Sequence, residues 1–329
     1  MPQTREHMEI CSLLGIEHGF IALTKIDLVD EEWLELATED VQDFARGTFL
    51  EGKPIVPVSA ASGEGIDHFI AALDEACGRI PDRPATSLFR LPVDRVFTMR
   101  GFGTVITGTV ASGRVRVGDT VMIFPSRATA KVRGIQVHNQ SVEESEAGLR
   151  TAINFQGLQK SEVQRGEVLS TPEGLEPSYM VDLEFLYLKS NPKAMKSRRR
   201  VRFHTGTGEI IGHMVLLDRE ELKPGESAYT QIRLEEPVAL VKEDRFVIRS
   251  YSPIRTIGGG RVLDPIPVKH KRFRPAVFEH LAVLAVGTDE EVVLRQVEAA
   301  GYRGISFRHL QLVSGLHQKE LDKMLQVLL

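Results

Sequence analysis

The pattern of apolar residues in this 329-residue chain changes near residue 80, and this change constrains the fold more than any other feature. Before it, helical spacing alternates with short apolar runs. Residues 30–49 read as an amphipathic helix with Trp33 on its buried face, and residues 53–60 read as a buried strand. After it, short β-type segments separated by glycine continue to about residue 267. The first pattern predicts a parallel sheet with helices, and the second predicts antiparallel barrels.

Polar and proline-rich stretches mark the expected domain boundaries. "IPDRPATS" at residues 80–87 contains two prolines and is typical of a linker, and "TPEGLEPS" at residues 171–178 divides the β-rich region. From Ser306 the sequence favours a helix-turn-helix with its turn at Gly315. The chain is therefore expected to be multidomain, with these domains: residues 1–84 (partial α/β), 85–175 and 176–268 (two β-barrels), and 269–329 (helices, the start of a winged-helix module).

Composition excludes several classes of protein. Charged residues make up 26% and hydrophobic residues 42% of the chain, as in soluble globular proteins. No apolar run reaches the length of a membrane span, and the N-terminus lacks the features of a secretory signal, so no membrane partner is expected. Cys11 and Cys77 lack metal-ligand spacing and are expected to be reduced, buried thiols, which favours a cytoplasmic location. No metal site is predicted.

The net charge of −4 does not by itself predict nucleic-acid binding, but the basic residues are clustered. Residues 189–204 hold seven Lys or Arg and no acidic residue, and "KHKRFR" spans residues 269–274. Arginine forks match phosphate oxygens, so Arg198, Arg199 and Arg200 are candidates for contacts with an RNA backbone. A solvated loop with counter-ions is the alternative for each cluster.

The stretch "FIALTKIDLVD" ends a buried strand in polar residues. A side chain at the carboxyl end of a parallel strand lies where nucleotides bind in open α/β sheets. The Asp27 carboxylate can accept both N1–H and the N2 amino group of guanine, whereas adenine presents an acceptor at N1. Lys25 can lay its stem along the base. One βα unit later, in "VSAASGEGI", the backbone N–H groups of Ser59 and Ala60 can point at the guanine O6.

Two observations limit this interpretation. A helix N-cap at Asp27 or Asp30 would also explain the motif. A guanine site further needs a phosphate-binding loop of the form G-x-x-x-x-G-K-[ST]. The nearest match begins at Gly47 and ends in Pro54, which has no hydroxyl for Mg²⁺, and it lies between a helix and a strand, the reverse of the required order. We therefore expect only the carboxyl half of a GTP-binding domain.

Taken in order, these motifs resemble the translational GTPases. Residues 100–119, "RGFGTVITGTVASGRVRVGD", are similar to the second-domain barrel of elongation factors, and residues 255–265, "RTIGGGRVLDP", to the closing strand of the third-domain barrel. Within this superfamily the chain is most similar to the selenocysteine-specific elongation factors. Asp94, Arg95 and Arg150 match the aminoacyl pocket of that family, and helices follow the two barrels.

The resemblance implies a pocket that selects selenocysteine by charge. A selenol has a low pKa and is an anion at neutral pH, whereas the cysteine thiol titrates at about 8.5. Arg95 and Arg150 stay charged under all conditions and would favour the selenolate over a neutral serine or thiol. Asp94 would hold the guanidiniums or accept the α-amino group. The alternative is a surface Asp–Arg pair of little energetic consequence.

The implied cofactors are GTP or GDP with Mg²⁺. Thr24 stands where the family's guanine motif begins with asparagine, which implies weaker nucleotide binding with guanine specificity kept by Asp27. The phosphate loop, the switches and the switch histidine are missing from this sequence. The chain, truncated at both ends relative to the family, is therefore expected neither to hydrolyse GTP nor to hold it tightly alone, and no catalytic residue is assigned.

The resemblance implies GTP-dependent delivery of selenocysteinyl-tRNA to a ribosome at a UGA codon. The expected partners are selenocysteinyl-tRNA, whose phosphates Arg198, Arg199 and Arg200 would contact, the ribosome, and a selenoprotein mRNA hairpin read by winged-helix domains beyond this chain. A monomer is expected. Two alternatives stay open: a non-enzymatic tRNA- or RNA-binding barrel protein, and a general translational GTPase.

Overall fold

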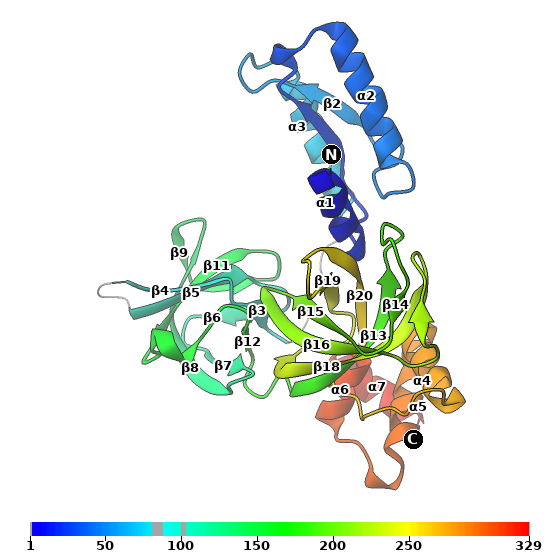
Figure 1. The fold of residues 1–329 in the computed structure, drawn as a ribbon. Coiled ribbons are helices and arrows are strands. Elements are labelled where there is room, and N and C mark those ends of the chain that lie inside the picture. The colour runs from blue at the N-terminus through cyan, green and yellow to red at the C-terminus, as the bar shows by residue number, and fades with distance from the viewer. Residues whose placement is uncertain (1, 81–87, 100–102, 329) are drawn as a thin grey trace. The chain divides into compact units, whose positions relative to one another are not determined.

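The computed structural model describes three stretches of the chain: residues 2–80, 88–99 and 103–328. The chain divides into two compact units, Met1–Asp82 and Arg83–Leu329. Apart from Ile80, the linker expected at residues 80–87 lies outside the described residues, as do residues 100–102 of the barrel motif. The expected order of an α/β part, two β-barrels and C-terminal helices is confirmed (Figure 1).

The first unit is a small α/β layer. Its elements are α1 Pro2–Leu13, β1 Ile21–Thr24, the 3-10 helix η1 Ile26–Leu28, α2 Glu31–Ala45, β2 Ile55–Val58 and α3 Ile66–Gly78. Strands β1 and β2 are parallel, and Thr24 at the end of β1 lies opposite Val58 at the end of β2. A helix that connects two parallel strands is the crossover that the sequence pattern predicts. Figure 1 shows α2 and α3 on opposite sides of the strand pair.

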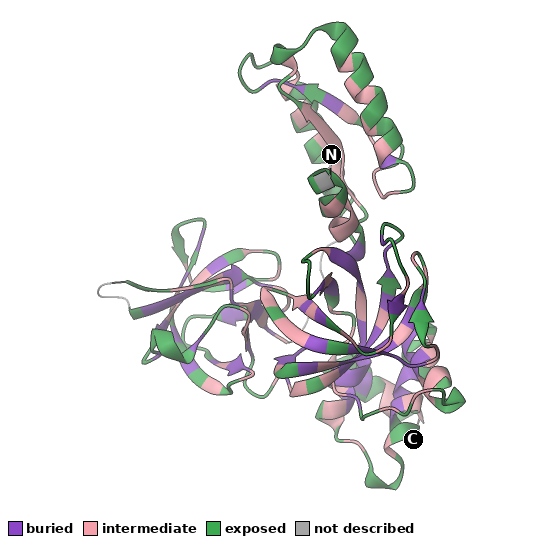
Figure 2. Ribbon diagram, viewed as in Figure 1, coloured by how far each residue is buried: buried purple, intermediate pink, exposed green. Residues whose placement is uncertain are grey.

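Three burial predictions in this unit were wrong. The Trp33 side chain is 65% exposed, Cys77 is exposed and Cys11 is only half-buried. The physical reason is the size of the sheet. Two strands of four residues offer little apolar surface, so much of α2 and α3 stays in contact with solvent (Figure 2).

The first barrel is an eight-stranded antiparallel sheet with a separate two-stranded ladder. Its strands are β3 Arg90–Pro92, β4 Arg95–Met99, β5 Gly103–Thr109, β6 Arg114–Arg116, β7 Thr120–Phe124, β8 Ala128–Val137, β9 Gln140–Val142, β10 Glu144–Glu146, β11 Arg150–Gln156 and β12 Val168–Ser170. The strand order is β3-β12-β7-β8-β11-β5-β4, with β9 paired to β8, and β6 pairs with β10. Alternation buries Thr151, Ile153 and Phe155 of β11, as the period of two requires.

The second barrel is closed by the strand order β13-β18-β16-β15-β19-β20. Its strands are β13 Pro177–Tyr187, β14 Met195–Lys196, β15 Arg199–Thr205, β16 Gly208–Leu216, β17 Glu221–Leu222, β18 Ser227–Ala239, β19 Arg245–Ser250 and β20 Thr256–Asp264. The predicted closing strand is confirmed, because β20 pairs with both β13 and β19. Only glycine fits at position 258, since a Cβ there would lie 2.3 Å from the Leu186 carbonyl oxygen and 2.5 Å from the Phe185 ring.

Helices complete the second unit: α4 Pro275–Val286, α5 Asp289–Ala300, the 3-10 helix η3 Gly301–Arg303, α6 Phe307–Ser314 and α7 Gln318–Leu328. Ser306 caps α6 through the backbone N–H of His309, and Gly315 ends it with a φ of 77°. The turn predicted at Gly315 is confirmed. The described residues from 269 to 328 contain no strand, so the winged-helix assignment stays a prediction. None of the helices in the described part of the chain has the length and apolar character needed to span a bilayer.

Candidate functional site

The predicted guanine loop lies at the carboxyl ends of β1 and β2. Thr24 ends β1 and is exposed, and Lys25 follows in the left-handed region with a φ of 66°, which is uncommon for a residue with a Cβ. Asp27 lies in η1 and is exposed. Asp30 caps α2, since its Oδ1 accepts the backbone N–H of Trp33 at 3.0 Å. The capping alternative therefore applies to Asp30, and the Asp27 carboxylate is left for another role.

Ser59 ties the two loops together. It is fully buried, and its hydroxyl donates to Oδ1 of Asp27, 32 residues earlier in the chain. The same hydroxyl oxygen accepts the backbone N–H groups of Ala61 and Ser62, each at 3.2 Å. These bonds fix the rotamer of Ser59 and, through it, the position of the Asp27 carboxylate at the surface.

The backbone donors of this loop differ from the prediction. The N–H of Ser59 donates to the Glu64 carbonyl oxygen at 2.9 Å and is already engaged within its own loop. Ser59 thus positions the carboxylate and does not offer its N–H to a base. Ala60 is exposed, and its N–H has no hydrogen-bond acceptor among the described residues. Of the two backbone donors, the Ala60 N–H is therefore the one left without an acceptor in the described part of the chain.

Asp94 and Arg150 form an ion pair on the first barrel. Val93 and Asp94 separate β3 from β4, and their backbone N–H groups donate to the carbonyl oxygens of Glu167 and Thr107. Arg150 begins β11, and its Nη2 donates to Oδ2 of Asp94 at 2.6 Å. The hydrogen bond from Arg150 holds the pKa of Asp94 below its ordinary value, so this carboxylate is ionised at neutral pH.

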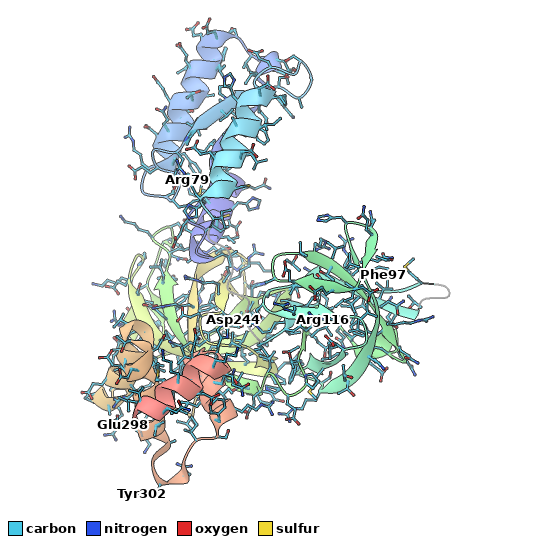
Figure 3. The ribbon with its side chains drawn as sticks, turned by 180° about the vertical axis from the view of Figure 1, so that it is seen from behind. Arg79, Phe97, Arg116, Asp244, Glu298 and Tyr302 are labelled. Atoms are coloured by element: carbon cyan, nitrogen blue, oxygen red, sulfur yellow. The ribbon has the colours of Figure 1, made fainter. Side chains whose placement is uncertain are left out.

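A cavity of about 510 Å³ opens beside this pair. Arg95 lines it, together with Lys160 and Arg165, two cations that the sequence motifs did not identify. Its apolar lining comes from Val96, Phe97 and Val163; Figure 3 marks Phe97 on the barrel. Arg95 and Arg165 also lower the pKa of the Asp94 carboxyl, since both charges lie near it. Cations therefore outnumber anions around the cavity.

The three arginines predicted to contact RNA lie in different environments. Arg198 is exposed in the turn before β15, with a φ of 66°, and Arg199 lies beside the Tyr187 hydroxyl. Arg200 points to the outer face, where its guanidinium lies over the Tyr251 ring at 4.3 Å. Arg202, two residues further on the same face, lies 5.3 Å from that ring. The structure thus brings together Arg200, Arg202 and Tyr251.

Two residues of the second basic cluster, residues 269–274, make buried structural contacts. Nε2 of His270 lies 2.5 Å from Oδ2 of the buried Asp182. Arg272 donates to the carbonyl oxygens of Leu216 and Arg219 at 2.8 and 2.6 Å. These two side chains fasten the segment to the second barrel. Lys269, Lys271 and Arg274 are exposed, and a phosphate contact by this cluster stays a prediction. Among the described residues, no group of three His, Cys, Asp or Glu side chains is placed to hold a metal ion.

Sequence reasoning missed Lys160, Arg165, Arg202 and Tyr251. The position of Arg202 could have been predicted, because side chains alternate along a strand and β15 therefore places Arg202 on the same face as Arg200. Tyr251 is brought to that face by the pairing of β15 with β19. Lys160 and Arg165 reach Asp94 only through the tertiary fold, and no local pattern marks them.

Three family models match successive parts of the chain. Residues 1–78 match the elongation factor Tu GTP binding domain, residues 103–170 match elongation factor Tu domain 2, and residues 184–269 match the beta-barrel domain of the selenocysteine-specific elongation factor. The order of these matches is the order of the α/β part and the two barrels.

Curated relatives agree with these matches. The selenocysteine-specific elongation factor of Desulfomicrobium baculatum is 48% identical, across 100% of this chain and 52% of the relative. The Escherichia coli (strain K12) protein of the same name is 30% identical, across 98% of this chain and 50% of the relative. The chain thus spans about half the length of the curated relatives it matches.

Solved structures give the same result. A crystal structure of a bacterial selenocysteine-specific elongation factor, EF-Sec, has a TM-score of 0.82 at 26% identity, covering 96% of this chain and 51% of that one. The elongation factor SelB from Methanococcus maripaludis, in its apo form, has a TM-score of 0.72 at 25% identity, covering 83% and 62%. The chain belongs to the family of selenocysteine-specific elongation factors.

Proposed function

We propose that this chain contributes to the GTP-dependent delivery of selenocysteinyl-tRNA to the ribosome at UGA codons. The observation that carries the proposal is the cationic cavity beside Asp94. Arg95, Lys160 and Arg165 line this cavity and Arg150 pairs with its carboxylate, so positive charge is in excess. An anionic side chain gains more from entering such a site than a neutral one of the same size. Selenocysteine carries an anion at neutral pH, and serine does not.

The ion pair of Asp94 with Arg150 contributes little to the stability of the fold, and we propose that its role is in the pocket. Arg150 is 56% exposed and Asp94 is 26% exposed, and an ion pair this open to solvent contributes about 0–1 kcal/mol. The pair instead fixes the direction of the Arg150 guanidinium. The ionised Asp94 carboxylate also has the charge to accept the α-amino group of the aminoacyl residue. Asp94, Arg95 and Arg150 are therefore proposed as the pocket, with Lys160 and Arg165 added to it.

Guanine recognition by the first unit is the second part of the proposal. Asp27, held by Ser59, presents a carboxylate edge that fits the two adjacent donors of guanine, and Ala60 N–H fits its O6. Thr24 ends β1 and Lys25 follows it, and both are proposed as further residues of this site. The cofactor would be GTP or GDP, and Mg²⁺ would accompany its phosphates. No residue of this chain is assigned to the phosphates or to Mg²⁺.

Contact with the tRNA body is the third part. Arg200 and Arg202 lie over Tyr251 at the outer face of the second barrel, where Arg200 also pairs with Glu235 and Arg202 with Glu209. Phosphate oxygens of the tRNA would replace these carboxylates as acceptors for the two guanidiniums. Arg198 and Arg199 are proposed as flanking contacts. The ribosome and a selenoprotein mRNA hairpin would be the further partners of the parent activity, which would take place in the cytoplasm with a monomeric factor.

The test compares one tRNA body charged with selenocysteine or with serine. We expect the chain to bind the selenocysteinyl form more tightly, and Arg95→Met or Arg150→Met to weaken that binding by about 10–100-fold, the range for a hydrogen bond to a charged group. Binding of the seryl form should change little. Arg133→Met is the control, since Arg133 is exposed on β8 and does not line the cavity.

Two outcomes contradict the proposal. Equal affinity for the two charged forms would favour a general translational GTPase. Equal affinity for charged and uncharged tRNA would favour a non-enzymatic RNA-binding protein. Each outcome is read from the same titration, because only the aminoacyl group differs between the ligands.

A further inference from the structure

A hairpin of the second barrel holds the backbone from which the aminoacyl pocket is built. Strands β15 and β16 are joined by Gly206 and Thr207, with Thr205 opposite Gly208. The Thr207 hydroxyl donates to the carbonyl oxygen of Val93 in the first barrel at 2.6 Å. This is a short, unambiguous hydrogen bond between two domains.

The two barrels approach closely at this contact, where glycine occupies positions 166, 206 and 208. A Cβ on Gly166 would lie 2.9 Å from the Cα of Gly208, and a Cβ on Gly206 would lie 3.3 Å from the Pro92 ring. Gly166 has a φ of 98°, which glycine adopts without strain. The hairpin therefore packs directly against the first barrel, with little space for the two backbones to move relative to each other.

Val93 is the point at which this contact reaches the pocket. It is fully buried, its N–H donates to the Glu167 carbonyl oxygen at 2.8 Å, and its own carbonyl oxygen accepts the N–H of Gly166 at 3.1 Å as well as Thr207. Asp94 and Arg95 follow Val93 directly, and Arg165 directly precedes Gly166. Both walls of the cavity thus extend from the backbone that Thr207 clamps.

The same strand connects the clamp to the outer face of the second barrel. Strand β15 carries Arg200 and Arg202 near its start and leads into the hairpin at its end. Seven residues of strand span roughly 20 Å. One continuous, paired strand therefore connects the arginine face with the hairpin that bonds to the Val93 carbonyl oxygen.

We propose that Thr207 is a positioning residue for the aminoacyl pocket, which sets the placement of Asp94 and thereby the selectivity between selenocysteinyl- and seryl-tRNA. This inference rests on the proposed function of the cavity. Thr207 does not contact the aminoacyl group and acts only through Val93. Loss of the hydroxyl should loosen Asp94 and weaken its alignment with Arg150 without removing any charge from the pocket.

A second tie between the barrels supplies the control. Nη1 of Arg90 donates to both carboxylate oxygens of Asp244, at 2.9 and 2.7 Å, and this pair is mostly buried. Asp244 does not bond to Val93, Asp94 or Arg150 in the described residues. Asp244→Asn therefore weakens the docking of the two barrels without touching the clamp.

The experiment uses the full chain with three variants: Thr207→Val, which keeps the volume and loses the hydroxyl; Thr207→Ser, which keeps the hydroxyl; and Asp244→Asn. The first readout is the Asp94 carboxyl titration followed by NMR. The second is the ratio of dissociation constants for the two charged tRNAs.

We expect Thr207→Val to raise the pKa of Asp94 toward its ordinary value and to lower the selectivity ratio by about tenfold, the scale of one lost hydrogen bond. Thr207→Ser should restore both, and Asp244→Asn should change neither.

The outcomes separate this inference from the function on which it rests. An unchanged Asp94 titration in Thr207→Val overturns the positioning role, and so does an equal change in Asp244→Asn, which would reduce Thr207 to a general docking contact. A wild-type chain that shows no preference for selenocysteinyl-tRNA, with the Asp94 titration still dependent on Thr207, contradicts the proposed function and leaves the clamp in place.

Discussion

At the residue scale, the guanine loop assigns two aspartates to two different tasks. Asp30 is used by the backbone as the cap of α2, whereas Asp27 is held by the side chain of Ser59. Burial of the Ser59 hydroxyl has an unfavourable desolvation free energy. Three hydrogen bonds at its oxygen offset this cost, one of them to the exposed Asp27 carboxylate. Such an arrangement is expected where the carboxylate must keep one direction.

Replacement of Asp27 should change which base is bound. Asp27→Asn puts an amide donor where guanine presents its N2 donors, so binding of guanosine nucleotides should be lost. Xanthosine nucleotides, which carry an acceptor at that position, should bind in their place. The measurement is ligand-detected NMR with GDP and XDP at millimolar concentration. The matched control, Asp30→Asn, keeps a side-chain oxygen that can cap α2, so it should leave both the stability of α2 and the base preference nearly unchanged. Guanosine binding that survives Asp27→Asn would remove Asp27 from the site.

At the element scale, the segment between β20 and α4 is fastened by buried ionisable groups. Gln231 donates to Asp182 at 2.9 Å and to the Val268 carbonyl oxygen at 3.0 Å, and His270 pairs with the same carboxylate. Burial and the charge of Asp182 raise the pKa of Asp264 to about 7. Burial lowers the pKa of His270, but its hydrogen bond and attraction to Asp182 outweigh this, and the net shift is upward.

The stability contributed by Asp264 should be lost as pH rises toward 7. Its pKa is 3.8 when unperturbed and about 7 in the fold, so between these values the folded state keeps a proton that the unfolded state has released. Each unit of pH in that window lowers the unfolding free energy by up to about 1.4 kcal/mol. His280 acts in the opposite direction between about 4 and 6.5, because burial lowers its pKa to about 4.

A difference measurement isolates Asp264 from His280. We expect urea unfolding to show that wild type gains stability over Asp264→Asn as pH falls from 7 to 5, with a constant difference above about 7.5. The exposed Asp322 supplies the control, since Asp322→Asn should leave the pH dependence unchanged. A wild-type-minus-Asp264→Asn difference that stays constant from pH 5 to 7.5 would contradict the assignment.

The local sequence pattern predicted the helices and strands well, but it did not predict which residues contact one another in the folded chain. The four C-terminal helices and most strands follow from apolar periodicity and from glycine or proline at their ends. The same pattern placed Trp33 inside, because periodicity describes one helix face and does not show whether a sheet is wide enough to cover it. His270 read as part of a basic cluster, since its buried partner Asp182 lies 88 residues away. The roles of Arg165 and Thr207 could not be predicted either, because the residues they act on, Asp94 and Val93, are also distant in the sequence.

At the scale of the second unit, α6 joins the two barrels and the helices. Leu312 of α6 packs in one cluster with Phe124 of the first barrel, Leu175 between the barrels and Ala239 of the second. Arg308 of α6 also pairs with Glu173 at 2.9 Å. Helix α6 therefore shares a hydrophobic core with both barrels.

Removal of the Leu312 side chain should therefore destabilise the whole unit and not only the helices. Leu312 is 5% exposed, and Leu312→Ala is expected to cost about 2–5 kcal/mol by transfer and cavity terms. The melting temperature of the barrels, followed by circular dichroism and calorimetry, should fall together with that of the helices. Val327→Ala, at a position 78% exposed, should stay within about 0.5 kcal/mol of wild type. If the helical circular dichroism signal were lost at a lower temperature while the melting temperature of the barrels stayed the same, α6 would not be part of this core.

The central claim, that the cavity beside Asp94 selects by charge, is tested most directly with cysteine. The selenocysteine tRNA would carry cysteine through a non-hydrolysable 3′-amide, and its dissociation constant would be measured from pH 7 to 9. Because the cysteine thiol ionises at about 8.5, binding should strengthen across this range, while the seryl analogue stays unchanged. Arg150→Met should flatten the cysteinyl profile. Parallel profiles for the cysteinyl and seryl ligands would contradict selection by charge.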